Sequence, residues 1–528
     1  MCGIAVAIGW EAPVAMVEKL ITGIMHRGDI TDPLASPRPD IAMRTRRLRI
    51  IDGANAIQPQ ASYDGRIIVA FNGEIYNHVA LRIQLEALGI KFTTQSDTEV
   101  LANSLMVWGV GALDRFVGMF AFVAINIDTG EFLAARDPFG VKPLYVMQSA
   151  SGYLFCSEMR PLLNATDAGD VMYLPPGHIL MRKGCRPYNV PQFAPDRELG
   201  QSSVKELDRL LSAAVGSRVP ADIPAAIMFS GGIDSTLLAH YARQVSPGTP
   251  GYILGASGAR DLEYAHNYAD QTGFDLRTIP FSPYQADTFA LMGDVVETVE
   301  SFEPSVVRGS LCSYLVSRQI HADGYRVALC GEGADELFAG YPVLEYVFSL
   351  GNAEARRVRT QNISLMHKSV LQRVDRCSMR FALEAREPFL DLSVAEYALR
   401  LDATALVHTV HGKPRGKAPL RSLYDLYPDE LPKMIRDREK VGFDEGAGLI
   451  EGGPDSAWLG LFEDAVSDHE FIEGQKEFSN FGIRSKEELF YIRKLAAKLD
   501  ISRVPYLLDR LYLYVPSGTP GAVPRRDR

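Results

Sequence analysis

Residues 226–236 have the types and spacing expected of an anion-binding turn. A short apolar run ends in Ser-Gly-Gly, and Asp234 and Ser235 then open an apolar-periodic segment. Two glycines let the backbone approach a ligand closely, and the first amides of a following helix point at that ligand. The Gly-Lys-Ser/Thr ending of a Walker A loop is missing. An ordinary tight turn between a strand and a helix therefore stays open as the alternative.

Residues 331–341 are a second candidate, because Asp335 follows another apolar run. An acidic side chain at the end of a strand suits magnesium (Mg2+), which favours oxygen ligands and phosphate partners. A helix start with an acidic first turn is the alternative. Since ligands bind at the carboxyl ends of parallel strands, Asp234 and Asp335 together favour a magnesium ion that they share with pyrophosphate.

Cys2 is a third candidate, since it becomes the first residue if Met1 is removed. Its thiol and its α-amine then belong to one residue. The amine has an ordinary pKa near ~7.7–8.0, so it can act as the base for the thiol. A buried, inert cysteine in a strand is the alternative.

The order of the predicted elements separates the chain into two domains. Over residues 1–185, alternating strands with two helices indicate an α+β domain. Residues 186–203 are rich in Pro, Gln and Ser and indicate a linker. Over residues 204–516, strands alternate with helices, which predicts an α/β domain with a parallel sheet and a helical C-terminal part. Residues 517–528 are rich in Pro, Gly and Arg and predict a disordered tail.

Composition narrows the class of protein. The 528 residues are 47% apolar and 23% charged, which is ordinary for a globular chain of two or more domains. The net charge of −10 argues against wholesale nucleic-acid binding. No apolar run approaches the ~18 residues of a membrane span, and no secretory signal is evident. Six scattered cysteines without CxxC pairs, and histidines without HExxH, argue against disulfides and zinc and fit a reducing cytoplasm.

The first half resembles the class II glutamine amidotransferase domain, which has the N-terminal-nucleophile hydrolase fold of stacked β-sheets with helices. The motifs that carry the resemblance are Met1 to Ile4, His26 to Gly28, Arg47-Leu48, Phe71 to Asn77, Ser96 to Glu99 and Ala135 to Tyr145. The run after Gly28 departs from the family pattern: it reads Asp29 to Pro33 where Pro-Asp and glycines are usual. We therefore expect a different lid over the glutamine pocket.

This resemblance implies roles for six residues. Cys2 would attack the side-chain amide of glutamine. Asn72 and the Gly73 amide would form the oxyanion hole, which contributes ~2.7–4 kcal/mol per donor. The residues that would hold the α-carboxylate and α-amine of glutamine are Arg47, Glu74 and Asp97. A plain helix cap is the alternative role for Asp97.

The second half, roughly residues 205–515, resembles the ATP-pyrophosphatase domain of the asparagine synthetase family. Besides the two loops, a cationic cluster carries the resemblance, and its segments are Arg373 to Arg376, Leu383 to Asp391, Lys413 to Lys417 and Arg438 to Phe443. We expect these cations to face inward. The residues that the resemblance implies for ATP are Phe229, Ser230, Gly231, Gly232, Asp234, Ser235, Gly331 and Glu332.

The resemblance also implies the reaction and its cofactors, ATP and magnesium. The ligands of magnesium would be Asp234 and Asp335, and Glu332 and Lys440 would be catalytic, with Lys440 stabilising the leaving group. A surface charge is the alternative role for Lys440. A carboxylate attacks the α-phosphorus of ATP, and ammonia made at Cys2 crosses an internal channel and displaces AMP. The substrates would be glutamine, ATP and a carboxylate, first of all aspartate, and relatives are usually homodimers.

The segment that would bind the carboxylate is less regular than the rest. Glu303, Arg308 and Ser310 are the residues implied for this role, ahead of a helix expected over residues 311–322. Val306 stands where a threonine is usual. Two further departures are Cys330, in place of serine, and Glu387, in place of an apolar residue.

These departures leave three alternatives to aspartate amidation. The chain could act on a related carboxylate in a specialised pathway. A β-lactam-forming synthetase is a further relative, but it typically lacks the N-terminal cysteine, so Cys2 argues against it. A non-catalytic scaffold is the third alternative, and the presence of nucleophile, oxyanion residues, pyrophosphate loop and acidic residues argues against it.

Overall fold

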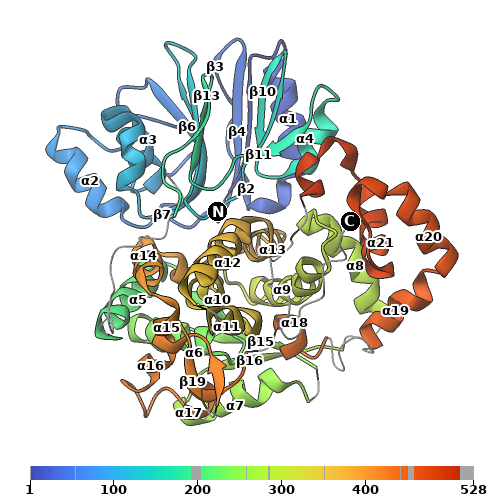
Figure 1. Cartoon of the computed structure of the whole chain (residues 1–528). Coiled ribbons are helices and arrows are strands. Elements are labelled where there is room, and N and C mark those ends of the chain that lie inside the picture. The colour runs from blue at the N-terminus through green and yellow to red at the C-terminus, as the bar shows by residue number, and fades with distance from the viewer. Residues whose placement is uncertain are drawn as a thin grey trace.

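The computed structural model describes residues 2–53, 55–191, 204–256, 258–282, 286–349, 351–410, 412–440, 442–449, 457–509 and 511. Two antiparallel sheets lie above a parallel sheet that is surrounded by helices (Figure 1). Most of the predicted linker and all of the predicted tail lie outside the described residues. The strand β13, Gly184–Pro187, continues the first domain past the predicted boundary at residue 185.

The N-terminal domain is built around two stacked antiparallel sheets, as predicted. The first has the order β11-β9-β10-β1-β4-β2, with β3 also paired to β4, and the second has the order β13-β12-β8-β7-β6-β5. The strands are β1 Cys2–Ile8, β2 Ile30–Thr31, β3 Ala35–Arg38, β4 Ile41–Arg47, β5 Gln60–Ala61, β6 Ile67–Ile75, β7 Gly118–Asn126, β8 Phe132–Arg136, β9 Tyr145–Ser149, β10 Gly152–Cys156, β11 Val171–Tyr173 and β12 His178–Met181.

Apolar side chains at alternate positions fill the space between these sheets. Ile4, Val6 and Ile8 of β1 share one core with Ala121 and Val123 of β7, as the two-residue period of a strand requires. Helices cover the outer faces (Figure 1). They are α1 Pro13–Gly23, α2 His78–Ala87, α3 Asp97–Trp108 and α4 Met159–Ala165. The sandwich therefore supports both edges of β1, the strand that begins with Cys2.

The C-terminal domain contains the predicted parallel sheet, with the order β16-β15-β14-β17-β18. Its strands are β14 Ala225–Met228, β15 Gly251–Gly255, β16 Leu276–Pro280, β17 Val327–Leu329 and β18 Glu384–Arg386; a separate hairpin pairs β19 His408–Val410 with β20 Lys413–Arg415. The central strands β14 and β17 are short and apolar, as expected of strands buried on both faces. Their carboxyl ends lead into the two predicted loops.

Helices form the rest of this domain. They are α5 Val204–Arg218, α6 Ile233–Val245, α7 Arg260–Thr272, α8 Ala286–Val299, α9 Pro304–Ala322, α10 Ala334–Phe338, α11 Pro342–Ser349, α12 Asn352–Leu365, α13 Val370–Met379, α14 Leu392–Arg400, α15 Ala403–Leu406, α16 Ala418–Tyr424, α17 Lys433–Asp437, α18 Phe443–Gly446, α19 Ala457–Ala465, α20 Asp468–Glu477 and α21 Lys486–Ala496. Helix α9 begins earlier than predicted, because Pro304 occupies its first turn, where its missing N–H costs nothing. No helix among the described residues is both long and apolar enough to cross a membrane.

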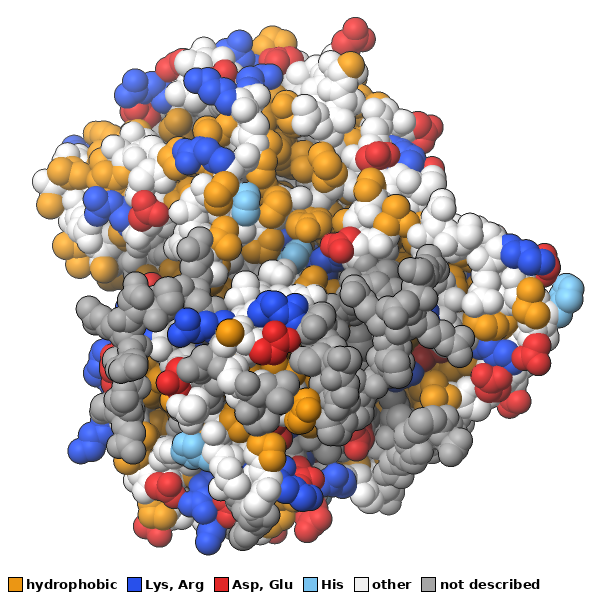
Figure 2. Space-filling model, in the orientation of Figure 1, with side chains coloured by type: hydrophobic (Ala, Val, Ile, Leu, Met, Phe, Trp, Pro, Cys, Tyr) orange, Lys and Arg blue, Asp and Glu red, His pale blue; other side chains and the backbone are white. Residues whose placement is uncertain are grey.

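Buried charges join the two domains. Arg27 of the first domain donates to both carboxylate oxygens of Asp375 in α13, at 2.9 and 3.0 Å. Arg376 reaches Glu158 of the first domain at 3.0 Å. Because unpaired buried charges are costly, such bidentate contacts fix one orientation of α13 against the first domain. On the outside, cations and carboxylates are interspersed over the face shown in Figure 2.

Candidate active sites

The loop after β14 has the geometry of an anion-binding turn. Gly231 has φ +62°, and a Cβ there would lie 2.8 Å from the amide nitrogen of Ala265, so only glycine fits. The Ser235 hydroxyl accepts from the Ser230 amide at 3.2 Å and lies 3.2 Å from the Ser230 hydroxyl. Helix α6 begins directly after the loop, and its first amides are therefore aimed at any bound phosphate.

Two aspartates and two lysines lie beside this loop. The Lys417 ammonium lies 2.5 Å from Asp234 Oδ2 and 2.5 Å from Asp335 Oδ1, and Lys440 lies 2.9 Å from Asp335 Oδ2. Burial alone would raise the pKa of Asp335, but the two lysines outweigh burial and lower that pKa. Burial raises the pKa of Asp234, with Lys417 opposing the shift.

Asp234 and Asp335 provide only two of the ligands that a magnesium ion needs. Asp234 Oδ1 is buried and has no hydrogen-bond partner within the described ranges, as expected of an oxygen that binds a cation once ligands arrive. No group of three or more His, Cys, Asp or Glu side chains that could hold a metal occurs in the described part of the chain. The two carboxylates therefore fit a magnesium ion whose other ligands are phosphate oxygens and water.

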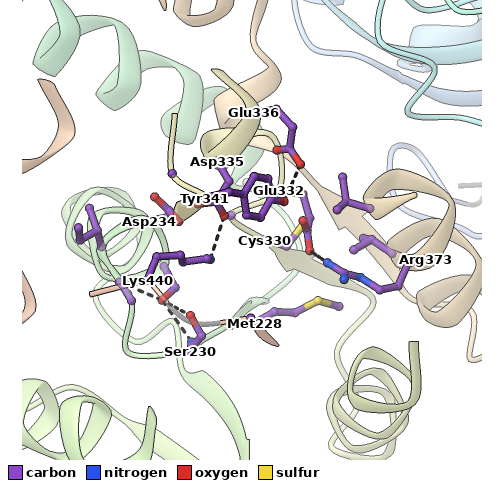
Figure 3. Close-up of a pocket in the computed structure, with 18 of the residues that line it drawn as sticks. Met228, Ser230, Asp234, Cys330, Glu332, Asp335, Glu336, Tyr341, Arg373 and Lys440 are labelled. Carbon is purple, nitrogen blue, oxygen red and sulfur yellow. Dashed lines mark hydrogen bonds and ion pairs between the residues drawn. The ribbon is translucent and has the colours of Figure 1, made fainter. Parts of the chain in front are cut away.

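These groups line one cavity of about 370 Å³, shown in Figure 3. The loop residues Phe229, Ser230 and Gly232 line it, as do Gly331 and Glu332. The predicted inward direction of the cationic cluster is confirmed, since the lining includes Arg373, Lys417, Arg438 and Lys440. Arg373 lies 2.6 Å from Glu332.

The residues predicted for the carboxylate do not line this cavity. Arg308 donates through Nε to Glu487 at 2.8 Å, Glu303 precedes α9 and contacts Arg484, and Ser310 donates back to the Val306 carbonyl. In their place, the same segment contributes Ser305 and Val306 to the lining, and Arg373 brings the guanidinium. Arg373 was predicted only as one member of the cationic cluster, because α13 meets the cavity only in the folded chain.

The Cys2 site combines a buried thiol with a free amide donor. The Cys2 nitrogen lies 2.9 Å from Asn72 Oδ1, an orientation that leaves Asn72 Nδ2 buried and without a partner among the residues that the structure describes. That donor is available for an oxyanion. A Cβ at Gly73 would lie 2.1 Å from the Met119 carbonyl oxygen, so glycine is required beside it. Burial raises the pKa of the Cys2 thiol to about 11, so a base must take its proton during attack.

Arg47 of β4 pairs with Cys2 of β1, and Glu74 and Asp97 are the other two charged residues predicted to bind glutamine. Arg47 donates through Nε and Nη2 to Asp32 at 2.7 and 3.0 Å. Burial raises the pKa of both Glu74 and Asp97, and for Glu74 repulsion from Asp97 adds to the shift. Two neighbouring buried carboxylates of this kind suit an α-ammonium group. Ser96 accepts from the Thr98 amide and is the helix cap, while Asp97 Oδ2 accepts from the Ile75 amide at 3.0 Å.

Asp32 is a residue that the sequence missed, although it lies in the run that departs from the family pattern. Its two oxygens hold Arg47 in one orientation and leave Arg47 Nη1 with only a long contact, 3.4 Å, to the Gly53 carbonyl. Replacing Asp32 by asparagine should raise the KM for glutamine about tenfold, since charge-assisted bonds contribute ~1.5–3 kcal/mol. Steady-state glutaminase assays measure this, and unchanged ammonia-dependent synthesis is the control. An unaltered KM would mean that Asp32 does not position Arg47.

Comparisons with known proteins agree with this division into two sites. A family model described as a glutamine amidotransferase domain matches residues 1–186, and one described as asparagine synthase matches residues 206–499. Glutamine-hydrolysing asparagine synthetase 1 of Arabidopsis thaliana is 32% identical, covering 87% of this chain and 80% of its own. The probable asparagine synthetase of Schizosaccharomyces pombe is 30% identical, covering 94% and 93%. A solved glutamine phosphoribosylpyrophosphate amidotransferase from B. subtilis is 20% identical over 47% of this chain and 65% of its own, with a TM-score of 0.30.

Proposed function

The chain belongs to the family of glutamine-hydrolysing asparagine synthetases, and from that premise we propose that the carboxylate it amidates is aspartate. It is a carbon–nitrogen ligase that takes its nitrogen from glutamine and uses ATP. The observation that supports adenylation of a carboxylate is that the Ser230 loop, the pair Asp234 and Asp335, and four cations all border one cavity. The relatives reported above are asparagine synthetases by name, so aspartate is the first carboxylate to test.

Glutamine hydrolysis is assigned to the N-terminal domain. Cys2 Sγ attacks the side-chain amide carbon, and Asn72 Nδ2 with the Gly73 amide stabilises the oxyanion. Because the thiol is protonated at neutral pH, the α-amine of Cys2 accepts its proton once Met1 is removed. Arg47 binds the α-carboxylate of glutamine, and Glu74 with Asp97 binds the α-ammonium. The bond from the amide carbon to nitrogen then breaks, the nitrogen takes the proton from the α-amine and leaves for the second domain as ammonia, and water releases glutamate from the remaining thioester.

Adenylation is assigned to the cavity of the C-terminal domain. A carboxylate oxygen of the substrate attacks the α-phosphorus, and the bond from that phosphorus to pyrophosphate breaks. The amides of residues 230–235 and Lys440 stabilise the charge that develops on pyrophosphate. Ammonia then attacks the acyl carbon and displaces AMP, and Glu332 accepts the proton that the nitrogen loses.

Magnesium completes the proposal. Asp234 and Asp335 are the side chains that would hold it. When bound, the ion neutralises charge on the phosphates and orients them.

We expect a reducing cytoplasm as the compartment, which agrees with six unpaired cysteines. We expect a homodimer as the assembly, and sedimentation velocity tests that oligomeric state.

A related carboxylate is the second candidate, and one lining residue favours it. Val306 offers a methyl surface where a threonine hydroxyl would donate a hydrogen bond. A pocket that hydrogen-bonds a polar group of its substrate strongly rejects analogues without that group. An apolar pocket rejects analogues that carry the polar group much less strongly. The loss of a hydroxyl therefore widens the range of side chains that fit.

A screen of carboxylates by pyrophosphate release tests both candidates. With ATP, magnesium and glutamine present, aspartate should release pyrophosphate at least about tenfold faster than glutamate or other amino-acid carboxylates. Release with another acid but not with aspartate would replace aspartate by that acid. No release with any carboxylate, from a chain that still hydrolyses glutamine, would favour a non-catalytic second domain.

A further inference from the structure

The end of strand β18 connects the two sites through consecutive side chains. Arg386 Nη2 donates to Glu74 Oε2 at 3.2 Å, at the glutamine site. The next residue, Glu387, accepts from the Cys330 thiol at 3.8 Å. Cys330 lines the cavity and lies beside Glu332 (Figure 3). Glu387 therefore lies between the domain that would release ammonia and the cavity that would consume it.

Glu387 is buried, and only one of its two carboxylate oxygens has a hydrogen-bond partner among the described residues. Its exposed fraction is 3%, and Oε2 has no hydrogen-bond partner in the described part of the chain. A buried carboxylate oxygen without a partner is costly, so an absent ligand that donates hydrogen bonds is the natural explanation. Sequence already marked this position, because an apolar residue is usual there.

The charged groups that face Glu387 come from both domains. They are Asp137 and Lys142 from the first domain and Arg218 and Asp375 from the second. Lys142 donates through Nζ to the Ala385 carbonyl at 3.3 Å, across the domain boundary, and its amide donates to Asp137. Asp137 also accepts from the Phe120 amide, and Phe120 pairs with Gly73. A continuous set of contacts thus leads from the oxyanion strand to Glu387.

On the cavity side, Glu387 meets apolar surface. Cys330, Val374 and Ala385 form a small apolar cluster with Met228 packed against it, and three of these four residues line the cavity. Desolvating a full charge against such a surface is far more costly than desolvating a neutral polar molecule. Ammonium would therefore stop at this cluster, whereas ammonia could pass.

Resting on the proposed function, we propose that Glu387 is a binding and proton-accepting site for ammonium in transit between the two domains. The carboxylate binds an ammonium ion, one N–H bond breaks as an O–H bond forms, and neutral ammonia continues towards Glu332. The carboxyl group is reset when it gives that proton to water as products leave. Glu387 is thus a positioning residue, since it does not touch the acyl-adenylate.

The acidity of Glu387 suits this exchange. Burial raises the pKa of its carboxyl to about 7; Lys142 and Arg218 oppose the shift, and Asp375 and Asp137 add to it. A group whose pKa lies near the working pH can both accept and return a proton. If Glu387 only balanced the charge of Lys142, its pKa would not need to lie near the working pH. Ammonia transfer would then not depend on pH.

The test compares the full-length chain with its Glu387→Gln variant. The measured quantity is the ratio of amide product to glutamate formed, with free ammonia in the medium assayed in parallel. At about pH 8, where the Glu387 carboxylate is mostly ionised and ammonium still predominates over ammonia, the ratio should fall about fivefold or more in the variant and free ammonia should rise; at about pH 6, where the carboxyl group holds its proton, the two proteins should converge. Glutaminase activity and synthesis from added ammonium chloride should not change, because neither needs the transfer step.

Matched variants separate transfer from packing. Glu297→Gln alters another partly buried carboxylate at the domain boundary, which pairs with Arg160 at 3.4 Å, and should keep the normal ratio. If the glutamine variant fails to fold, Glu387→Val should give the same pH-dependent loss. An equal ratio in wild type and variants at every pH would overturn the inference, whereas loss of glutaminase or of pyrophosphate release in the wild type would overturn the proposed function.

Discussion

Replacing Cys2 by alanine should abolish glutamine hydrolysis and glutamine-dependent amide formation while ammonia-dependent synthesis continues. In the proposed mechanism the thiol of Cys2 is the nucleophile that forms the acyl intermediate. Loss of a covalent nucleophile leaves only binding and oxyanion stabilisation, so we expect a fall of at least about 10³-fold in glutaminase kcat. Glutamate release and amide formation with either nitrogen source are the two measurements.

Structure explains why the second activity should survive. Cys2 lies on β1, 4% exposed, and its polar contacts include Asn72, Arg27 and Gln58, all of the same domain. The smaller alanine leaves the strand pairing with Arg47 intact. Cys185→Ala is the matched control, since that thiol is exposed and belongs to β13; both activities should remain. Loss of ammonia-dependent synthesis in the Cys2 variant would refute a separate glutaminase site.

Local sequence was enough for the parts of this protein that depend on neighbours in the chain. The apolar run and glycine pair at residues 225–235 predicted both β14 and the turn, because strand burial and positive φ are local requirements. The same holds for the acid after β17, whereas the stacked sheets were expected only from the resemblance to a known family. The inward direction of the cations was predicted from the cluster as a whole and not from the spacing of any one segment.

Contacts between segments that are far apart in the chain could not be predicted from local sequence patterns. Arg308 was expected in the substrate pocket, but α9 begins at Pro304 and Arg308 meets Glu487, 179 residues away in the chain. Lys417 was only one cation of a cluster, yet it pairs with two aspartates in the first turns of different helices, α6 and α10. Asp32 looked like a departure in a lid and proved to be the partner of Arg47. Each depends on tertiary packing that no local period encodes.

Replacing Lys440 by methionine should lower the kcat of amide synthesis about 10²–10³-fold, the usual effect of removing one group that stabilises transition-state charge. Arg438 anchors this segment, donating to the Gly231 carbonyl at 2.9 Å and to Asp261 at 2.6 Å. Lys440 then reaches Asp335 with 31% of its side chain still exposed. Burial opposes its charge, but Asp335 and Asp234 outweigh burial and raise the pKa of Lys440, so it stays charged.

Lys417 is the informative comparison, because it touches the same aspartate with only 4% exposure. Removing it leaves two buried carboxylates without their shared cation, so Lys417→Met should also lower stability, by about 3 kcal/mol or more. Lys440→Met should keep the melting temperature and glutaminase activity, since solvent can replace its contact. The exposed Lys433→Met variant is the control for charge alone. Normal pyrophosphate release in Lys440→Met, or a fall in its stability equal to that of Lys417→Met, would assign Lys440 to structure rather than to the leaving group.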